Sequence, residues 1–234
     1  MRALLFALVL ALPGGALAQD TDLELVLLAD ASGSIDSREY DLQREGYATA
    51  IVDPEVLEAI ANTAYGSIAV TYVEWAANQV VVAEWTRIAD REDAELFAAR
   101  VLAPPRRAIG RNAIGSALLE GLELMEENDI EGWRRVIDFS GDSVNSYSGP
   151  PIAAARERVL AAGVTINGLP ILRPGDPGRA MGGLEALFAE RIVGGPSSFV
   201  VTAESRASFA EAIKRKLILE ISGEVPQRNV ATAR

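Results

Sequence analysis

Three oxygen-bearing side chains at alternate positions, Asp30, Ser32 and Ser34, form the most chemically suggestive pattern in the sequence. They follow a short apolar run, residues 23–29, which is typical of a strand buried on both faces. Gly33 between the serines gives the backbone the freedom to bring the three side chains together. Carboxylate and hydroxyl oxygens are hard ligands, so the pattern predicts a divalent-cation site at the end of this strand.

The composition narrows the chemistry further. The 234 residues contain neither histidine nor cysteine, and 49% of them are hydrophobic. The lack of histidine and cysteine excludes Ser-His-Asp and Cys-His catalysis, and also zinc or haem sites that depend on imidazole or thiolate. Any metal must therefore be held by oxygen. The hydrophobic fraction is enough to build the core of one domain.

The charge balance bears on the choice of partner. Asp and Glu total 33 against 22 Lys and Arg, which gives a formal net charge of −11. Nucleic acids and anionic membranes attract cationic surfaces, so we expect neither as a partner. Lysine occurs only at Lys214 and Lys216, and we expect both on a solvated helix surface.

The first 18 residues have the pattern of an export signal. Arg2 supplies a positive start, residues 3–12 form an apolar run, and Ala16 and Ala18 place small residues before a cleavage point. A membrane anchor is the alternative, but the run falls short of the roughly 20 apolar residues that span a bilayer. No second stretch of spanning length is present in the sequence, so we expect a mature protein that is periplasmic or secreted.

Apolar runs and helical periods alternate through the rest of the chain. Strands are predicted over residues 23–29, 68–75, 80–85, 135–140, 164–172 and 199–202. Helices are predicted over residues 37–52, 54–62, 90–102, 113–127, 151–162, 184–192 and 206–221. The alternation predicts an α/β fold with a doubly wound, mostly parallel sheet and helices on both faces. The short connection at residues 76–79 predicts a hairpin, hence one antiparallel strand.

No internal repeat or linker divides the sequence. We therefore expect a single domain over residues 19–221. Residues 174–183 are predicted to form a loop, and residues 222–234 a polar, disordered tail. In such a sheet, ligands bind at the carboxyl ends of the strands, where Asp30 lies.

The Asp-x-Ser-x-Ser run at residues 30–34 resembles the metal-ion-dependent adhesion site of von Willebrand factor A domains. Those domains have a Rossmann-like, doubly wound sheet with one antiparallel edge strand, in agreement with the predicted hairpin. Within that fold, the chain is most similar to an exported bacterial family of unknown function (DUF1194-like). Segments that carry this resemblance include Leu-Gln-Arg-Glu-Gly-Tyr at residues 42–47 and Ile-Asn-Gly-Leu-Pro at residues 166–170.

The resemblance implies two further metal ligands. Asp142, in Ser-Gly-Asp at residues 140–142, matches the aspartate that completes the site. Asn112 stands where those domains have a threonine, and Arg111 beside it brings a cation towards the site. Ser143 takes the place of a usual glycine. The implied metal ligands are therefore Asp30, Ser32, Ser34, Asn112 and Asp142, for a divalent cation that is best matched by Mg²⁺, with Mn²⁺ or Ca²⁺ as alternatives.

In the family that this chain resembles, an acidic side chain of a partner completes the coordination of the ion. The resemblance therefore implies an exported, metal-dependent, adhesion-type protein-binding module and no enzymatic turnover. The alternatives are a Mg²⁺-dependent phosphatase or hydrolase that uses Asp30, and a metal-free structural scaffold of the same fold. Such enzymes usually need a second acidic residue two positions on and a nearby lysine. Ser32 stands at that position, and no lysine precedes Lys214.

Capping and ion pairing are simpler roles for several of these residues. Asn112 is suited to cap the helix that follows it, and Asp142 to accept hydrogen bonds within its own loop. Glu74 and Asp138 lie in otherwise apolar strands. One interpretation is a supporting role around the ion, or a pairing with an arginine such as Arg44. We favour the other, in which each is part of a structural ion pair or lies at an edge position.

Overall fold

The computed structural model describes residues 19–172, 183–203 and 208–226. The predicted leader, most of the predicted loop at 174–183 and the end of the predicted tail lie outside the described residues. The strands are β1 (Gln19–Asp30), β2 (Ile68–Trp75), β3 (Gln79–Ile88), β4 (Ile130–Gly141) and β5 (Thr165–Pro170). The helices are α1 (Ser37–Ile51), α2 (Pro54–Ala61), α3 (Arg91–Leu102), α4 (Ile114–Glu126), α5 (Ile152–Ala161), α6 (Gly183–Arg191) and α7 (Phe209–Ser222).

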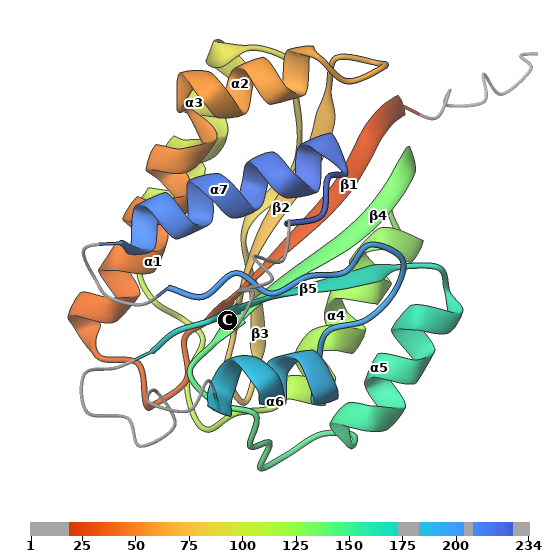
Figure 1. Ribbon diagram of the computed structural model, residues 1–234. Coiled ribbons are helices and arrows are strands. Elements are labelled where there is room, and N and C mark those ends of the chain that lie inside the picture. The colour runs from red at the N-terminus through yellow and green to blue at the C-terminus, as the bar shows by residue number, and fades with distance from the viewer. Residues whose placement is uncertain (1–18, 173–182, 204–207, 227–234) are drawn as a thin grey trace, which may run out of the picture.

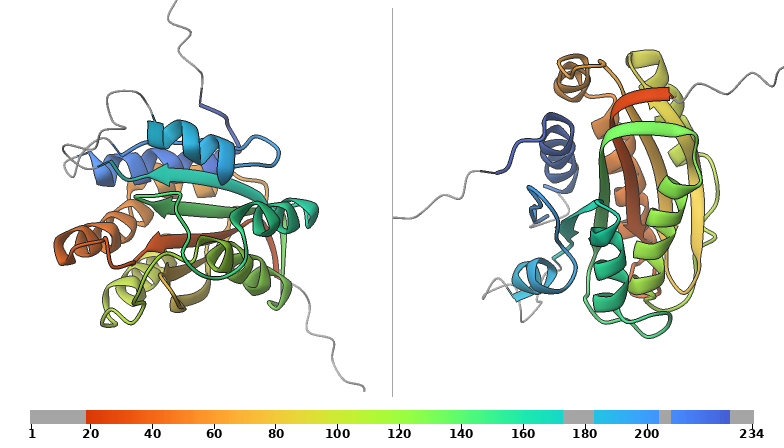
Figure 2. Two further views of the ribbon diagram at one scale, coloured as in Figure 1. Left: turned by 90° about the horizontal axis from the view of Figure 1, so that it is seen from below. Right: turned by 90° about the vertical axis from the view of Figure 1, so that its right-hand side faces the viewer.

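The strands form one sheet in the order β3-β2-β1-β4-β5, with β1 at its centre. β1 pairs in parallel with β2 and β4, and β4 pairs in parallel with β5. β3 is antiparallel to β2 at the edge, which confirms the predicted hairpin. Seen from below, β5, β4 and β1 lie side by side with their arrows pointing the same way (Figure 2). The carboxyl ends of the parallel strands therefore meet at one edge of the sheet, at the lower end in Figure 1.

Helices cover both faces of the sheet, as predicted for the α/β fold (Figure 1). On one face, Leu23, Leu25 and Leu27 of β1 share a core with α1, α2, α3 and α7. On the other face, Val26 and Leu28 pack with α4, α5 and α6. Because alternate side chains of β1 are buried on opposite faces, the strand is apolar at almost every position. Burial of each such side chain contributes roughly 1.5–3 kcal/mol.

The segment predicted as a last strand, residues 199–202, is not a strand. It meets the region of β5 through isolated bridges at Val200 and Ala203. The N–H of Phe199 donates to the side-chain Oδ1 of Asn167 at 3.1 Å. The N–H groups of Val201 and Ala203 donate to the carbonyls of Gly168 and Pro170 at 3.0 and 3.2 Å. Pro170 has no N–H to donate in return, so the ladder is interrupted there and no regular strand forms.

Lys216 corrects a second expectation. Its side chain does not lie on a solvated surface but is fully buried on α7, where Nζ lies 2.6 Å from Oδ1 of Asp138 and 2.5 Å from Oε1 of Glu220. Asn167 donates a further hydrogen bond to the same Glu220 oxygen at 3.0 Å. The predicted structural ion pair of Asp138 is therefore present, and it ties α7 to the sheet. Across the described residues, every helix is too short or too polar to span a bilayer.

Candidate metal centre

Asp30 lies at the carboxyl end of the central strand, where it is 1% exposed. Its Oδ1 accepts a hydrogen bond from the N–H of Ser32 at 2.8 Å, which closes the turn that follows β1. The hydroxyl oxygens of Ser32 and Ser34 lie 3.0 Å apart. The fold thus brings the three loop residues of the predicted site together on one turn.

Helix α1 fixes this loop at its far end. Asp36 caps the helix: its Oδ1 accepts from the N–H of Glu39 at 2.8 Å, and Oε2 of Glu39 accepts from the N–H of Asp36 at 3.2 Å. One turn further along, the side-chain amide of Gln43 donates to the carbonyl of Asp30 at 2.8 Å. The beginning and the end of the loop are therefore both attached to α1.

A second carboxylate comes from the neighbouring strand. Asp142 follows β4, and its N–H donates to Oδ2 of Asp30 at 3.4 Å. A Cβ on Gly141 would lie 3.2 Å from the same oxygen and 3.0 Å from the Trp75 ring, so a side chain at this position would crowd both. Burial, and next the negative charge of Asp142, raises the pKa of the Asp30 carboxyl to about 7. Two carboxylates at one buried edge favour a cation between them.

Asn112 belongs to a third loop, residues 103–113, and is 5% exposed. In this loop, the carbonyl of Gly110 accepts from the N–H of Gly33 at 2.8 Å. The carbonyl of Asn112 itself accepts from the N–H of Tyr147 at 2.8 Å. Backbone hydrogen bonds therefore join this loop to the other two, and they place Asn112 beside them.

The alternative role of Asn112 as a helix cap is not observed. Helix α4 has Ala113 as its N-cap residue, without a side-chain cap. The N–H of Ile114 donates instead to Oγ of Ser146 at 3.1 Å. Ser146 comes from the loop after β4, so α4 is capped by the loop that also carries Asp142.

Arg106 is not among the predicted site residues, yet it binds the first loop, residues 31–36, from a position far along the sequence. Its Nη2 donates to the carbonyls of Ala31 at 2.5 Å and Ser32 at 2.8 Å, and its Nη1 donates to the carbonyl of Ile35 at 3.2 Å. The guanidinium also lies over the Tyr40 ring, 5.0 Å from the centroid. Because 75 positions separate Arg106 from Ala31, no local pattern could predict this contact.

Arg111, which the sequence places beside the site, stacks on the ring of Tyr147 at the rim of the site. The guanidinium carbon lies 3.5 Å from the centroid of the Tyr147 ring. Both side chains are exposed. The expected approach of this cation to the metal ligands is therefore limited by an aromatic partner in the loop after β4.

A buried ion pair between Arg44 and Glu74 connects the elements that carry the loops of the site. Nε of Arg44 lies 2.7 Å from Oε1 of Glu74, with both side chains almost fully buried. The hydroxyl of Tyr40 donates to Oε2 of Glu74 at 3.0 Å, and Arg44 also donates to the carbonyl of Pro104. The predicted ion pair of Glu74 is confirmed, and it connects α1, β2 and the loop of Arg106.

The donor set suits a hard divalent cation. Asp30 and Asp142 offer carboxylates, Ser32 and Ser34 offer hydroxyls, and Asn112 offers an amide from the adjoining loop. The described residues contain no group of three or more His, Cys, Asp or Glu side chains that could hold a metal. The candidate centre therefore offers only two carboxylates, and its other ligands are neutral oxygens. Such a composition suits an ion that retains bound water, such as Mg²⁺.

Comparison with known proteins adds a family and a fold. The family model described as "Protein of unknown function (DUF1194)" matches residues 20–225. No curated protein matches the sequence. Similar solved structures include proximal thread matrix protein 1 from the mussel byssus with a zinc-occupied MIDAS motif, at a TM-score of 0.63 and 17% identity over 88% of this chain and 50% of that chain.

Two further similar structures come from bacteria. The pilus adhesin SpaC from Lactobacillus rhamnosus GG has a TM-score of 0.59 and 13% identity over 87% of this chain and 31% of that chain. The vWF domain of the type V pili tip protein Mfa5 from Porphyromonas gingivalis has a TM-score of 0.55 and 11% identity over 84% of this chain and 94% of that chain. The chain spans half the length of the mussel protein and less of SpaC. At these identities the likeness concerns the fold.

Proposed function

The chain belongs to the DUF1194 family and has the fold of von Willebrand factor A domains, and from this premise we propose that it is a protein-binding module whose site depends on a divalent cation. The observation that carries the proposal is that Asp142, half-buried at the end of β4, lies against the buried carboxyl of Asp30 and raises its pKa. A divalent cation bound between them would relieve their mutual repulsion.

Each proposed ligand has a role set by its chemistry. Asp30 and Asp142 supply negative charge, and Ser32 and Ser34 supply neutral oxygen. Asn112 offers an amide carbonyl, which binds an ion directly or through a water. An ion held by these residues would supply a positive charge that an acidic group of a partner could bind. Mg²⁺ suits a site with few direct protein ligands, and Mn²⁺ and Ca²⁺ are the alternatives.

Binding rather than turnover is supported by the surroundings of Asp30. Its Oδ1 accepts the Ser32 N–H, its Oδ2 lies close to Gly141, and the residue is 1% exposed. A carboxylate in this setting is poorly placed to attack a phosphoryl group. The buried lysine of the described residues, Lys216, is committed to its own ion pairs.

The partner and the compartment are also part of the proposal. The pattern of residues 1–18 supports export, so we infer a periplasmic or secreted protein. The partner would be an exported or envelope protein that presents a carboxylate. That the same fold occurs in a pilus adhesin and in a pili tip protein supports this inference.

Metal titration tests the proposal directly. The purified protein, first treated with a chelator, is titrated with Mg²⁺, Mn²⁺ or Ca²⁺ while its thermal midpoint and heat of binding are recorded. Because the ion binds the folded state, it should stabilise that state by about 2.7 kcal/mol at a concentration one hundred times its Kd. A midpoint that stays unchanged up to millimolar ion would contradict the proposal and favour the metal-free scaffold.

Two variants locate the site. Asp30→Asn and Asp142→Asn should each abolish the metal response while the metal-free protein stays folded, since each removes one of two repelling carboxylates. The control is Glu58→Gln, an exposed carboxylate on α2, which should keep the full response. Phosphatase activity that disappears in Asp30→Asn would instead identify the enzyme.

A further inference from the structure

The charge of the protein is unevenly distributed along the chain. The net charge is −11, yet residues 96–119 contain four arginines and no carboxylate. This stretch includes the loop 103–113, which carries Asn112. A cationic segment beside the candidate metal centre is therefore a local exception on an acidic protein.

Two of these arginines are available to a partner. Arg107 and Arg111 are exposed, and within the described part of the chain neither pairs with a carboxylate. Arg106 differs, because its guanidinium is occupied by three backbone carbonyls of the first loop. Position 106 is thus structural, and positions 107 and 111 present unneutralised charge.

Arg111 is held in a defined place. Its guanidinium stacks on the Tyr147 ring at 3.5 Å, and the N–H of Tyr147 donates to the carbonyl of Asn112, the next residue. Stacking uses the face of the guanidinium and leaves its N–H edge for hydrogen bonds. Such an edge matches a carboxylate, which it can bind through two parallel hydrogen bonds.

The balance of charge at this end of the molecule favours an anion once the metal site is filled. We call the loops 31–36, 103–113 and 142–150, together with Asp30, the metal pole. Its acidic and basic side chains are three carboxyls and three guanidiniums, a set with no net charge when all six are ionised, namely Asp30, Asp36, Asp142, Arg106, Arg107 and Arg111. A divalent cation would add two positive charges to this neutral set.

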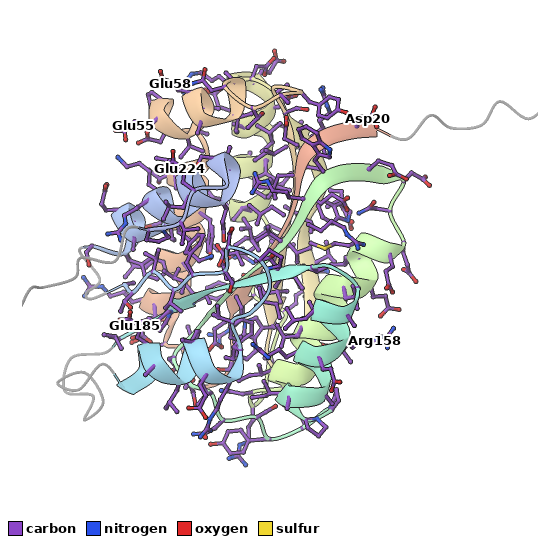
Figure 3. The ribbon with its side chains drawn as sticks, turned by 45° about the vertical axis from the view of Figure 1, so that its right-hand side comes forward. Asp20, Glu55, Glu58, Arg158, Glu185 and Glu224 are labelled. Carbon is purple, nitrogen blue, oxygen red and sulfur yellow. The ribbon has the colours of Figure 1, made fainter. Side chains whose placement is uncertain are left out.

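The opposite end of the molecule is acidic. Asp20, Glu55, Glu58 and Glu224 lie in the upper part of Figure 3, whereas the loop after β4 runs along the lower edge. Because the net charge of the protein is −11, an acidic partner is repelled by the molecule as a whole, whereas the metal pole with its cation would attract it and orient its approach. Two exposed apolar side chains, Ile109 at 67% and Tyr147 at 55%, add contact area beside the arginines.

Resting on the proposed function, we propose that the metal pole recognises an acidic segment of a partner protein through two neighbouring carboxylates. One carboxylate meets the cation held by Asp30 and Asp142. The other binds the edge of the Arg111 guanidinium, which Tyr147 positions. A segment with a single acidic residue lacks the contact with Arg111. Arg111 therefore sets the preference for a segment with two neighbouring acidic residues.

Fluorescence anisotropy with labelled peptides tests the inference. The probes are Gly/Ser peptides that contain either two aspartates separated by one leucine, one aspartate, or none. With saturating Mg²⁺, the peptide with two aspartates should bind about tenfold more tightly than the peptide with one. Binding should be lost with chelator and should weaken as the salt concentration rises.

Variants separate the role of Arg111 from that of the metal. Arg111→Gln should reduce the affinity for the diacidic peptide to that for the monoacidic one, and Arg111→Lys should restore only part of it. Both should leave the Mg²⁺ affinity and the thermal midpoint unchanged or slightly raised. Arg158→Gln, which removes an exposed arginine on α5, is the matched control.

The outcomes distinguish this inference from the proposed function. Equal affinity for the two acidic peptides, no binding of either, or no effect of Arg111→Gln, each with Mg²⁺ bound, would overturn the inference alone. Failure to bind Mg²⁺ at all would overturn the proposed function and the inference with it.

Discussion

Asn112 occupies the position at which von Willebrand factor A domains carry a threonine. Its side chain is buried and is not used to cap α4, because Ser146 accepts the hydrogen bond of the Ile114 N–H. An amide is longer and forked, and its carbonyl is an uncharged ligand that reaches further than a hydroxyl. The residue therefore determines how closely the third loop can approach an ion.

Replacing this amide by a hydroxyl gives a prediction at the scale of one residue. Asn112→Thr should tighten Mg²⁺ binding severalfold, since the shorter side chain restores the ligand of the resembled family. Isothermal calorimetry on the chelated protein measures the change. Equal or weaker affinity would mean that the rest of the site has adapted to the amide.

The residues of the candidate site differ in how far the sequence could identify them. Asp30, Ser32 and Ser34 fall within five positions of one another, so a single local pattern contains all three. Asp142 was reached through the family resemblance, and the structure brings its N–H to Asp30. Arg106 lies 75 positions from the carbonyl that it binds, and only folding creates that contact.

Among the structural elements, the three loops of the metal pole act as one unit. The N–H of Gly33 donates to the carbonyl of Gly110, and the N–H of Tyr147 donates to the carbonyl of Asn112. Arg106, in the loop 103–113, binds the carbonyls of the first loop. Because each loop is fixed by another, the positions of the proposed metal-binding oxygens depend on hydrogen bonds between groups that are not metal ligands themselves.

Arg106→Gln should weaken this unit. The substitution leaves the carbonyls of Ala31, Ser32 and Ile35 without the fork that binds them, so we expect a loss of about 1–3 kcal/mol in stability. The Mg²⁺ affinity should fall at the same time, because the loop is less well ordered. Thermal unfolding and calorimetry provide the two measurements.

The neighbouring arginine is the control for this prediction. Arg107→Gln removes the same charge from an exposed side chain and should leave stability within about 0.5 kcal/mol of the wild type. If both variants behave alike, then the contribution of Arg106 is one of charge and not of hydrogen bonding.

The strands show where sequence patterns succeed and where they fail. β2 is buried along its whole length and was predicted with its observed bounds, Ile68–Trp75. β4 begins at Ile130, not at residue 135. In its first half the exposed side chains of Glu131 and Trp133 alternate with half-buried residues, and this half pairs with the start of β1. The segment 199–202 has strand composition and meets β5 through isolated bridges, and its ladder is interrupted at Pro170, which has no N–H to donate.

At the scale of the whole molecule, a buried charged cluster joins the last helix to the sheet. Lys216 of α7 binds Asp138 of β4 and Glu220, and Asn167 of β5 donates to Glu220. Burial raises the pKa of Glu220 to about 7, with the negative charge of Asp138 adding to it and Lys216 opposing it. The positive charge of Arg134 also acts on this carboxyl.

The raised pKa makes stability depend on pH in a defined direction. Between pH 4.5 and 7, folded Glu220 holds its proton while the unfolded chain releases it, so stability falls as pH rises through this window. A shift of this size corresponds to a loss on the order of 3 kcal/mol. Urea unfolding at pH 5 and pH 8 measures it.

Glu220→Gln should flatten this pH dependence. The raised pKa values of Asp30 and Asp138 add slopes of the same sign, so the variant should keep a smaller slope, and its difference from the wild type gives the part that depends on Glu220. Glu224→Gln, which changes an exposed carboxyl nearby, should retain the slope of the wild type. An unaltered slope in Glu220→Gln would show that this carboxyl is ionised in the folded protein at both pH values.

The central position of β1 has a mechanical consequence. A partner attached at Asp30 would pull along the axis of a strand that is hydrogen-bonded on both sides, to β2 from Leu23 to Asp30 and to β4 from Gln19 to Leu28. Tension in that direction shears the two ladders, so many hydrogen bonds must yield together and cannot peel apart in sequence. We expect the attachment point to withstand a force that would unzip a strand at the edge of the sheet.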